Sequence, residues 1–342
     1  MPSDTRPSDQ QRRGRPRVAL LALCGLGLGL GALALAARRR NSDIGAPPAD
    51  PAPLAEHTRR AVPKPGGRSP KVAAARGLNQ ASAMLAFSVL FDSAIEHGRA
   101  DFFNKAMYAP LVSSTASIVA SVHGSMDSRE SFHALRHAAL VLAGLTGLAG
   151  GALHVYNVSR REGGFVFQNL FYAAPLGAPY ALVLSGLLGA AAEWVRDANG
   201  DEPRLLGVEA DRMLAGITSL GLLGTVGEAG LLHFRGAFQN PAMVIPVTLP
   251  PVAAALLVKA AIEPRKSGGS FPLSRWWLGA TATVGIASVF FHSYGVARMM
   301  GGWRNWRQNL FDGPPLPAPP SFTGLALAGI AALRLAERSR HG

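Results

Sequence analysis

The sequence predicts an all-α, multi-pass membrane protein, with one N-terminal anchor or signal helix followed by eight transmembrane helices. Hydrophobic residues make up 48% of the 342 residues and charged residues only 16%, against about 25% charged residues in soluble domains. The apolar residues gather into runs of about 20, the length that crosses a hydrocarbon core of roughly 30 Å. Because backbone polar groups in lipid must pair within their own segment, we expect these runs to be helices.

The N-terminal part of the chain, before the first hairpin, divides into three segments. Residues 1–17 are polar and basic and are predicted to be disordered. Residues 18–37 form an apolar run that reads either as a cleaved signal peptide or as a membrane anchor. Its length exceeds the 7–15 residue core of a signal peptide, which favours the anchor. Residues 38–76 are rich in Pro and Ala and are predicted to be a linker.

The remaining apolar runs come in pairs, which predicts four helical hairpins in two four-helix halves, 77–200 and 201–342. The first helix of each hairpin is expected at 78–97, 137–158, 213–233 and 276–298. The second helix is expected at 109–125, 175–195, 243–262 and 319–337. Since an even number of spans separates the first helices, all four should run in the same direction through the membrane.

The turn of every hairpin contains an Asn followed six positions later by a Pro. The pairs are Asn104 and Pro110, Asn169 and Pro175, Asn240 and Pro246, and Asn309 and Pro315. Nine Asn and 25 Pro in the chain would give about one such pair by chance, so the pattern predicts an internal repeat. We favour a structural role, in which Asn caps the second helix and Pro opens it. The alternative is a non-helical segment that lines a cavity.

Polar residues near the ends of the first helices group the hairpins two by two. The second and fourth share the pattern His-x-Tyr-x-Val-x-Arg, with His154 and Tyr156 in one and His292 and Tyr294 in the other. The first and third instead carry a Glu, and these residues are Glu96 and Glu228. The alternation of Glu and His predicts two halves related by pseudo-symmetry.

Four parallel first helices would place the two Glu and the two His at a similar depth. Ionisable groups inside a membrane are costly, so they usually face the interior of a bundle and pair there. A convergent set could relay protons or bind a metal ion through His154, His292, Glu96 and Glu228. The two His alone could be the axial ligands of a b-type haem. In the alternative interpretation each residue only reaches toward the headgroups.

Charge and composition bear on partners and location. The net charge of +13 lies in tails and between apolar runs, where anionic lipid headgroups explain it better than nucleic acid does. The bilayer is therefore the predicted partner, and no protein partner is indicated. Richness in Gly, Ala and Arg is typical of GC-rich bacteria, which predicts a bacterial inner membrane. Acids that end the second helices, such as Glu193, are interpreted as solvated helix ends.

Three functions follow as hypotheses. The first is a transporter or channel with an intramembrane Glu and His site. The second is a redox component that binds a metal or haem b, and the third is a scaffold or assembly factor without catalysis. The sequence contains no nucleotide-binding loop, no serine-nucleophile motif and no kinase signature, so an enzyme of a soluble type is not predicted.

Overall fold

Helix α3 begins the part of the chain that the computed structural model describes, which comprises residues 69–172, 175, 177–200, 202–263 and 270–338. The predicted basic N-terminus (1–17), the anchor or signal helix (18–37) and the linker as far as residue 68 lie outside these residues. The described chain is almost entirely helical, and the predicted all-α membrane class is confirmed.

Eight helices of at least 18 residues run through the described residues. They are α3 (Pro70–Arg99), α4 (Ala109–Met126), α5 (Ala134–Ser159), α7 (Gly177–Arg196), α8 (Ala210–Arg235), α9 (Ile245–Ile262), α10 (Pro272–Arg298) and α12 (Pro320–Arg338). Each overlaps one predicted helix. The largest difference is the start of α3, eight residues before the predicted residue 78. Its early start follows from Pro70 in the first turn and the alanines after it, which are strong helix formers.

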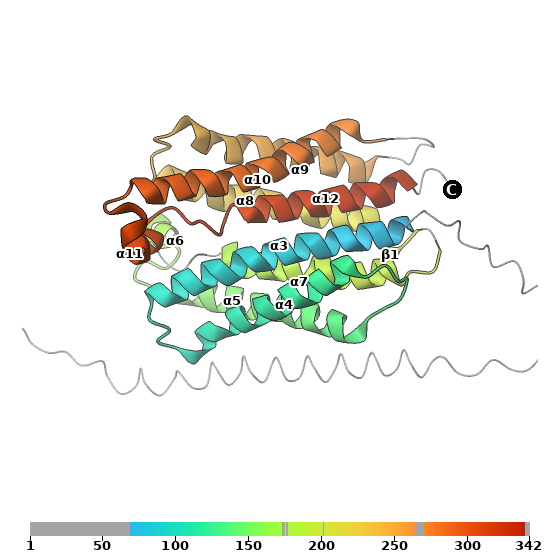
Figure 1. Cartoon of the computed structure of the whole chain (residues 1–342), viewed down its shortest axis with the longest axis horizontal. Helices are drawn as coiled ribbons and strands as arrows, with labels where there is room; N and C mark the ends of the chain where they lie inside the picture. Colours follow the sequence, from blue (N-terminus) through green and yellow to red (C-terminus); the bar gives the residue numbers. More distant parts are fainter. Residues whose placement is uncertain (1–68, 173–174, 176, 201, 264–269, 339–342) are drawn as a thin grey trace, which may run out of the picture. The chain divides into compact units, whose positions relative to one another are not determined.

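Short elements connect the long helices. Two 3₁₀ helices, η1 (Lys105–Tyr108) and η2 (Pro241–Val244), precede α4 and α9. Helix α6 (Phe167–Tyr172) precedes α7, and η3 (Gly302–Asn305) with α11 (Trp306–Asp312) precedes α12. An antiparallel pair of strands, β1 (Arg204–Leu205) and β2 (Val208–Glu209), leads into α8. In Figure 1, α6 and α11 lie at one end of the helix bundle and β1 at the other.

Six helical segments are long and apolar enough to cross a membrane. They are Pro70–Arg99, Ala134–Ser159, Gly177–Arg196, Ala210–Arg235, Pro241–Ile262 and Pro272–Arg298. Helix α4 falls short because five serines lower its hydropathy, and α12 falls short because Arg334 and Glu337 lie near its end. Large apolar side chains are exposed on the spanning segments, for example Leu220 and Phe290. Such exposure suits contact with lipid, so the chain is a membrane protein.

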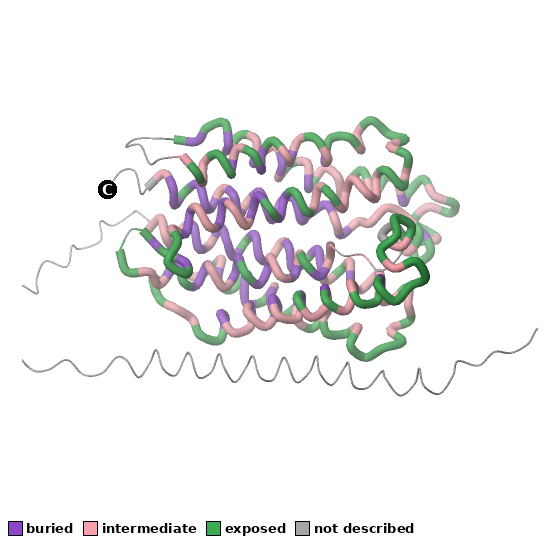
Figure 2. The backbone as a smooth tube through the Cα atoms, turned by 180° about the vertical axis from the view of Figure 1, so that it is seen from behind, coloured by how far each residue is buried: buried purple, intermediate pink, exposed green. Residues whose placement is uncertain are grey.

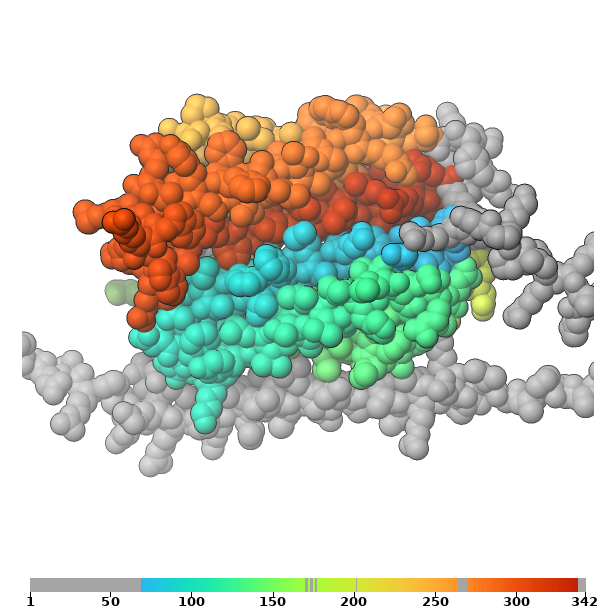
Figure 3. Space-filling view, viewed as in Figure 1, coloured from blue at the N-terminus to red at the C-terminus, as the bar shows by residue number. Residues whose placement is uncertain are grey.

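Helix α3 lies in the middle of the bundle, where it packs against α4, α7 and α12. Buried residues concentrate along these inner helices and exposed residues along the outer helices and the ends (Figure 2). Figure 3 shows α12 and α3 side by side on one face. Small residues permit close packing between α5 and α7, since a Cβ at Gly186 would lie 2.5 Å from the backbone N of Gly144.

Buried hydroxyl groups join α3, α4 and α7 to one another. The Oγ atoms of Ser82 and Ser185 are 3.1 Å apart, and Ser185 Oγ lies 2.9 Å from Ser117 Oγ. Ser121 Oγ donates to Ser82 Oγ across 2.8 Å. All four serines are fully buried. Hydrogen bonds of this kind hold helices together in lipid, where the hydrophobic effect gives no driving force between helices.

At the end of the bundle opposite α6, the acid near the end of α7 is buried rather than solvated. Glu193 accepts two hydrogen bonds from the Arg136 guanidinium, from Nε at 2.7 Å and from Nη2 at 2.6 Å. Neither side chain is more than 1% exposed. Arg136 also donates to Asp127 at 3.0 Å. The interpretation of Glu193 as a solvated helix end was therefore wrong, because α5 begins against the end of α7.

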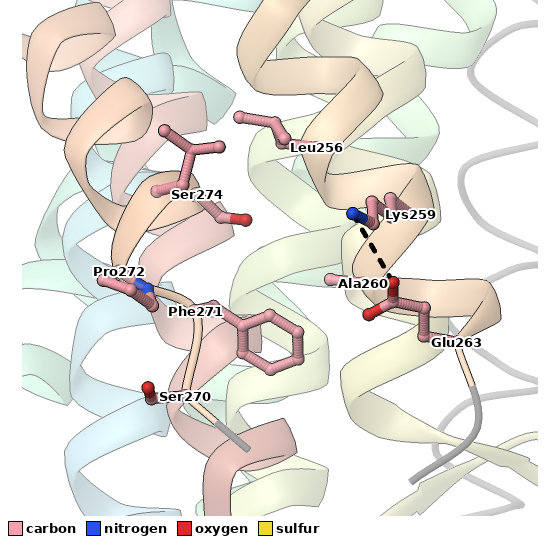
Figure 4. A pocket seen from close by; sticks show the side chains of 9 residues that line it. Leu256, Lys259, Ala260, Glu263, Ser270, Phe271, Pro272 and Ser274 are labelled. Carbon is pink, nitrogen blue, oxygen red and sulfur yellow. Dashed lines mark ion pairs between the residues drawn. The ribbon is translucent and has the colours of Figure 1, made fainter. Parts of the chain in front are cut away.

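The same end carries a shallow pocket between the end of α9 and the start of α10 (Figure 4). Lys259 and Glu263 form an ion pair of 3.6 Å on its rim, and both side chains are exposed. None of the sequence-predicted site residues lines this pocket. It is therefore separate from the candidate site at the other end.

Candidate functional site

A histidine near the end of each first helix forms a hydrogen bond with a backbone carbonyl in the turn of its own hairpin. The Nδ1–O distances are 2.8 Å from His97 to Met107, 2.6 Å from His154 to Pro175, 2.9 Å from His233 to Met243 and 2.7 Å from His292 to Pro315. A carbonyl oxygen can only accept a hydrogen bond, so Nδ1–H is the donor in all four. In the neutral imidazole, Nε2 then carries a free lone pair.

The four turns follow two patterns of hydrogen bonding. In the first and third, Asn104 and Asn240 cap the 3₁₀ helices η1 and η2 by accepting from Ala106 N and Ala242 N. Both asparagines therefore act as N-caps, as predicted, but they cap the short 3₁₀ helices and not the long helices α4 and α9. Pro110 and Pro246 occupy the first turns of α4 and α9, as predicted.

In the second and fourth turns the asparagines have a different role. Asn169 Nδ2 donates to the carbonyls of Glu162 and Gly164. Asn309 Nδ2 donates to the carbonyls of Met300 and Gly302. These bonds tie α6 and α11 to the preceding loops. The carbonyls of Pro175 and Pro315 then accept from His154 and His292, so these prolines help to orient the histidines.

Two of the four histidines, His97 and His233, were not among the predicted site residues. Each lies seven residues before the Asn of its turn, at Asn104 and Asn240. This equal spacing is a signal in the sequence that aligns α3 with α8, His97 with His233 and Asn104 with Asn240. Further contacts agree with that alignment, since Phe102 and Phe238 pack edge-on against His97 and His233 at centroid distances of 6.2 and 6.1 Å.

The same alignment gives Glu228 a different counterpart from the one predicted. Glu228 lies five residues before His233, and the residue five before His97 is Asp92, not Glu96. Glu96 instead forms an ion pair of 3.1 Å with Arg99, and both side chains are at least 30% exposed. The structure thus places Glu96 in a solvent-accessible pair at the end of α3.

Asp92 and Glu228 are each seven residues from the end of their helix, about 10 Å along its axis. Both are half-buried. The Glu228 carboxylate also faces the backbone N–H of Gly177 at the start of α7, where a Cβ would overlap Oε2. A helix N-terminus favours a negative group at this position.

One of the predicted histidines, His292, lies beside a histidine of the adjacent hairpin. The rings of His292 and His233 have centroids 6.4 Å apart and planes at 79°. No ring contact joins His154 to His292 within the described ranges. The partner tyrosines point outward, with Tyr156 53% and Tyr294 61% exposed.

The predicted four-ligand metal centre is not assembled. Over the residues that the structure describes, no three or more His, Cys, Asp and Glu side chains come together in a group that could hold a metal ion. Among these polar residues, His233 and His292 are the two whose side chains contact each other, and Asp92 and Glu228 occupy matching positions on α3 and α8. Comparison of the chain with protein-family models, with curated proteins and with solved structures finds no match.

Proposed function

We propose that this protein is a transporter or channel for a small cation, protons included, with Asp92 and Glu228 as its central groups. The observation that carries this proposal is the matching placement of two half-buried acids on two apolar helices, each five residues before a histidine that is bonded to its turn. Acids are rare in membrane segments and line ion or proton paths when they occur there. Two ionised carboxylates in apolar surroundings repel one another, and a proton or cation between them relieves the repulsion.

The architecture that we propose is eight membrane spans in four hairpins, arranged as two related halves in a bacterial inner membrane. The alignment of α3 with α8 supports it, because one and the same offset along the chain matches Asp92 with Glu228 and His97 with His233. The parallel order of first helices would place both acids at one depth. Parallel repeats around an axis along the membrane normal are a known transporter plan, in which the site lies at the interface of the repeats.

In this proposal the two acids have unequal surroundings, which suits stepwise transfer. Glu228 faces the backbone N–H of Gly177 at the start of α7. Asp92 lies one helical turn before Glu96 on α3, and like charges at this spacing repel one another. A cation that arrives at Asp92 would then pass to Glu228.

The test is cation flux into proteoliposomes that contain the purified full-length protein. Vesicles would be loaded with a pH-sensitive dye and exposed in turn to gradients of H⁺, Na⁺ and K⁺. The proposal expects at least one of these gradients to dissipate faster than in protein-free vesicles. It also expects the rate to return to the protein-free value in the Asp92→Asn/Glu228→Gln double variant. A double variant with the flux of the unaltered protein would refute the assigned site.

A further inference from the structure

We infer that His233 and His292 form a transition-metal binding pair in which the Nε2 atoms are the ligands. This inference goes beyond the proposed cation path, because it uses imidazoles and not the carboxylates of Asp92 and Glu228. The two rings come from different hairpins, on α8 and α10, and meet at a centroid distance of 6.4 Å. The site would bind a metal that prefers imidazole nitrogen, such as copper, zinc or iron.

Hydrogen bonds hold both imidazoles in the tautomer that leaves Nε2 unprotonated. Nδ1–H of His233 donates to Met243 O, and Nδ1–H of His292 donates to Pro315 O. Metal-binding histidines almost always donate their other ring N–H to a carbonyl, carboxylate or water, because this bond fixes the ring and leaves the ligand nitrogen unprotonated. Both residues meet that condition. Within the described ranges neither Nε2 atom has a hydrogen-bond partner in the protein.

A second pair of histidines in the same protein shows that ring proximity alone does not give this arrangement. His123 and His133 pack with centroids 5.4 Å apart and planes at 87°. The Nδ1 atom of His133, however, accepts from the backbone N–H of Arg136 at 3.2 Å. Neutral His133 therefore carries its proton on Nε2 and offers no lone pair there. This pair serves as an internal control.

The separation of the His233 and His292 rings fits two ligands of one metal ion. A bond from Nε2 to a metal such as zinc measures about 2.0–2.1 Å, so two imidazoles on opposite sides of one metal have centroids about 6 Å apart. The observed 6.4 Å is close to that value. The remaining coordination positions would be taken by water or by an external ligand, because no third protein ligand joins the pair among the described residues.

The other half of the chain repeats part of the arrangement. His97 and His154 carry the same Nδ1–H bonds to the carbonyls of Met107 and Pro175, so their Nε2 atoms are also unprotonated in the neutral rings. Among the described residues no ring contact joins these two histidines, whereas one joins His233 to His292. The metal is therefore assigned to His233 and His292 alone.

The test uses full-length protein in detergent, stripped with a chelator and titrated with Cu²⁺ alone. Copper is the divalent ion that nitrogen ligands hold most tightly. We expect one Cu²⁺ per chain at this site, and an electron paramagnetic resonance spectrum with coupling to two nitrogens per copper. The same two imidazoles could also bind haem iron, and an absorbance spectrum of the protein as purified tests this. A Soret band that is lost when either histidine is substituted would identify the bound group as haem.

The variants are His233→Ala and His292→Gln, the second of which keeps an amide donor for Pro315 O. Each variant should weaken copper binding by more than about tenfold. Loss of a residue that only hydrogen-bonds a metal ligand already lowers metal affinity by about 10–100-fold, and these variants remove a ligand itself. His123→Ala is the matched control and should bind like the unaltered protein. The inference is overturned if the protein takes up neither copper nor haem, if the bound copper has oxygen ligands only, or if the variants bind unchanged.

Discussion

Asp92 on α3 and Glu228 on α8 occupy matching positions relative to the histidine and asparagine that follow each of them. Each lies five residues before a histidine whose Nδ1–H donates to a carbonyl three residues after the Asn of the turn. Each also lies seven residues from the end of its helix. The proposed cation path rests on this relationship. The Glu228 carboxylate also lies against Gly177 at the start of α7.

Gly177→Ala should lower cation flux although it removes no charged group. A Cβ at residue 177 would overlap Glu228 Oε2, so the carboxylate must move away from the N-terminus of α7. Proteoliposome flux measures the effect, and we expect a loss of at least about tenfold, as for other displaced catalytic groups. Gly227→Ala, next to Glu228 on α8, is the control because a Cβ there meets no atom within 4 Å. Equal flux in the two variants would contradict the assignment of Glu228.

Glu193→Gln should destabilise the fold strongly. The substitution leaves the buried guanidinium of Arg136 without its main counter-charge, and breaking a buried pair costs about 3–5 kcal/mol. The free energy of unfolding in detergent, compared with that of Glu263→Gln, measures this cost. Glu263 forms an exposed pair with Lys259, and such pairs contribute at most about 1 kcal/mol. Similar losses in the two variants would show that the Arg136 pair is not buried in the membrane-embedded protein.

Gly186→Ala should also destabilise the protein, by about 1–3 kcal/mol, because a Cβ would press on the backbone of Gly144. The matched change is Gly216→Ala on α8, where a Cβ meets nothing within 4 Å. There we expect no loss, or a gain of up to about 1 kcal/mol from helix propensity. The same unfolding measurement compares the two. A neutral Gly186→Ala would mean that α5 and α7 lie farther apart than described.

Stability should fall at acid pH because of Asp127, which follows the last residue of α4. A hydrogen bond from Arg129 is the main cause that lowers the pKa of Asp127, and bonds from Arg136 add to it. A carboxyl group with a lowered pKa in the folded protein stabilises it above the unfolded value of about 3.9. That contribution is lost as the pH falls below about 4. As the pH is lowered from 6 to 3, the unfolding midpoint should drop more steeply for the unaltered protein than for the Asp127→Asn variant. Parallel curves would exclude this role for Asp127.

The helices were predictable because each long apolar run must pair its own backbone groups in lipid. All eight long helices overlap a predicted range. The candidate site was only partly predictable. Matching by residue type aligned Glu96 with Glu228, whereas the spacing from histidine to asparagine aligns Asp92 with Glu228. Residue type alone does not reveal helix register.

Contacts between distant segments were the least predictable part. The position of Glu193 near the end of a helix is apparent from the sequence, but its burial depends on Arg136, which is 57 residues away. The pairing of His233 with His292 likewise depends on how α8 and α10 pack against α9 and α12. No local periodicity records such contacts, because they are set by packing between hairpins.

The central claim is that Asp92 and Glu228 carry the cation, and single-variant flux in proteoliposomes tests it most directly. Asp92→Asn and Glu228→Gln keep size and hydrogen bonding but remove the charge. Glu96→Gln is the matched control, because the exposed Glu96 pairs with Arg99 at the helix end. The account predicts that each of the first two variants abolishes flux while Glu96→Gln retains at least about half of it. Unchanged flux in both Asp92→Asn and Glu228→Gln, with the protein intact by size-exclusion chromatography, would contradict it.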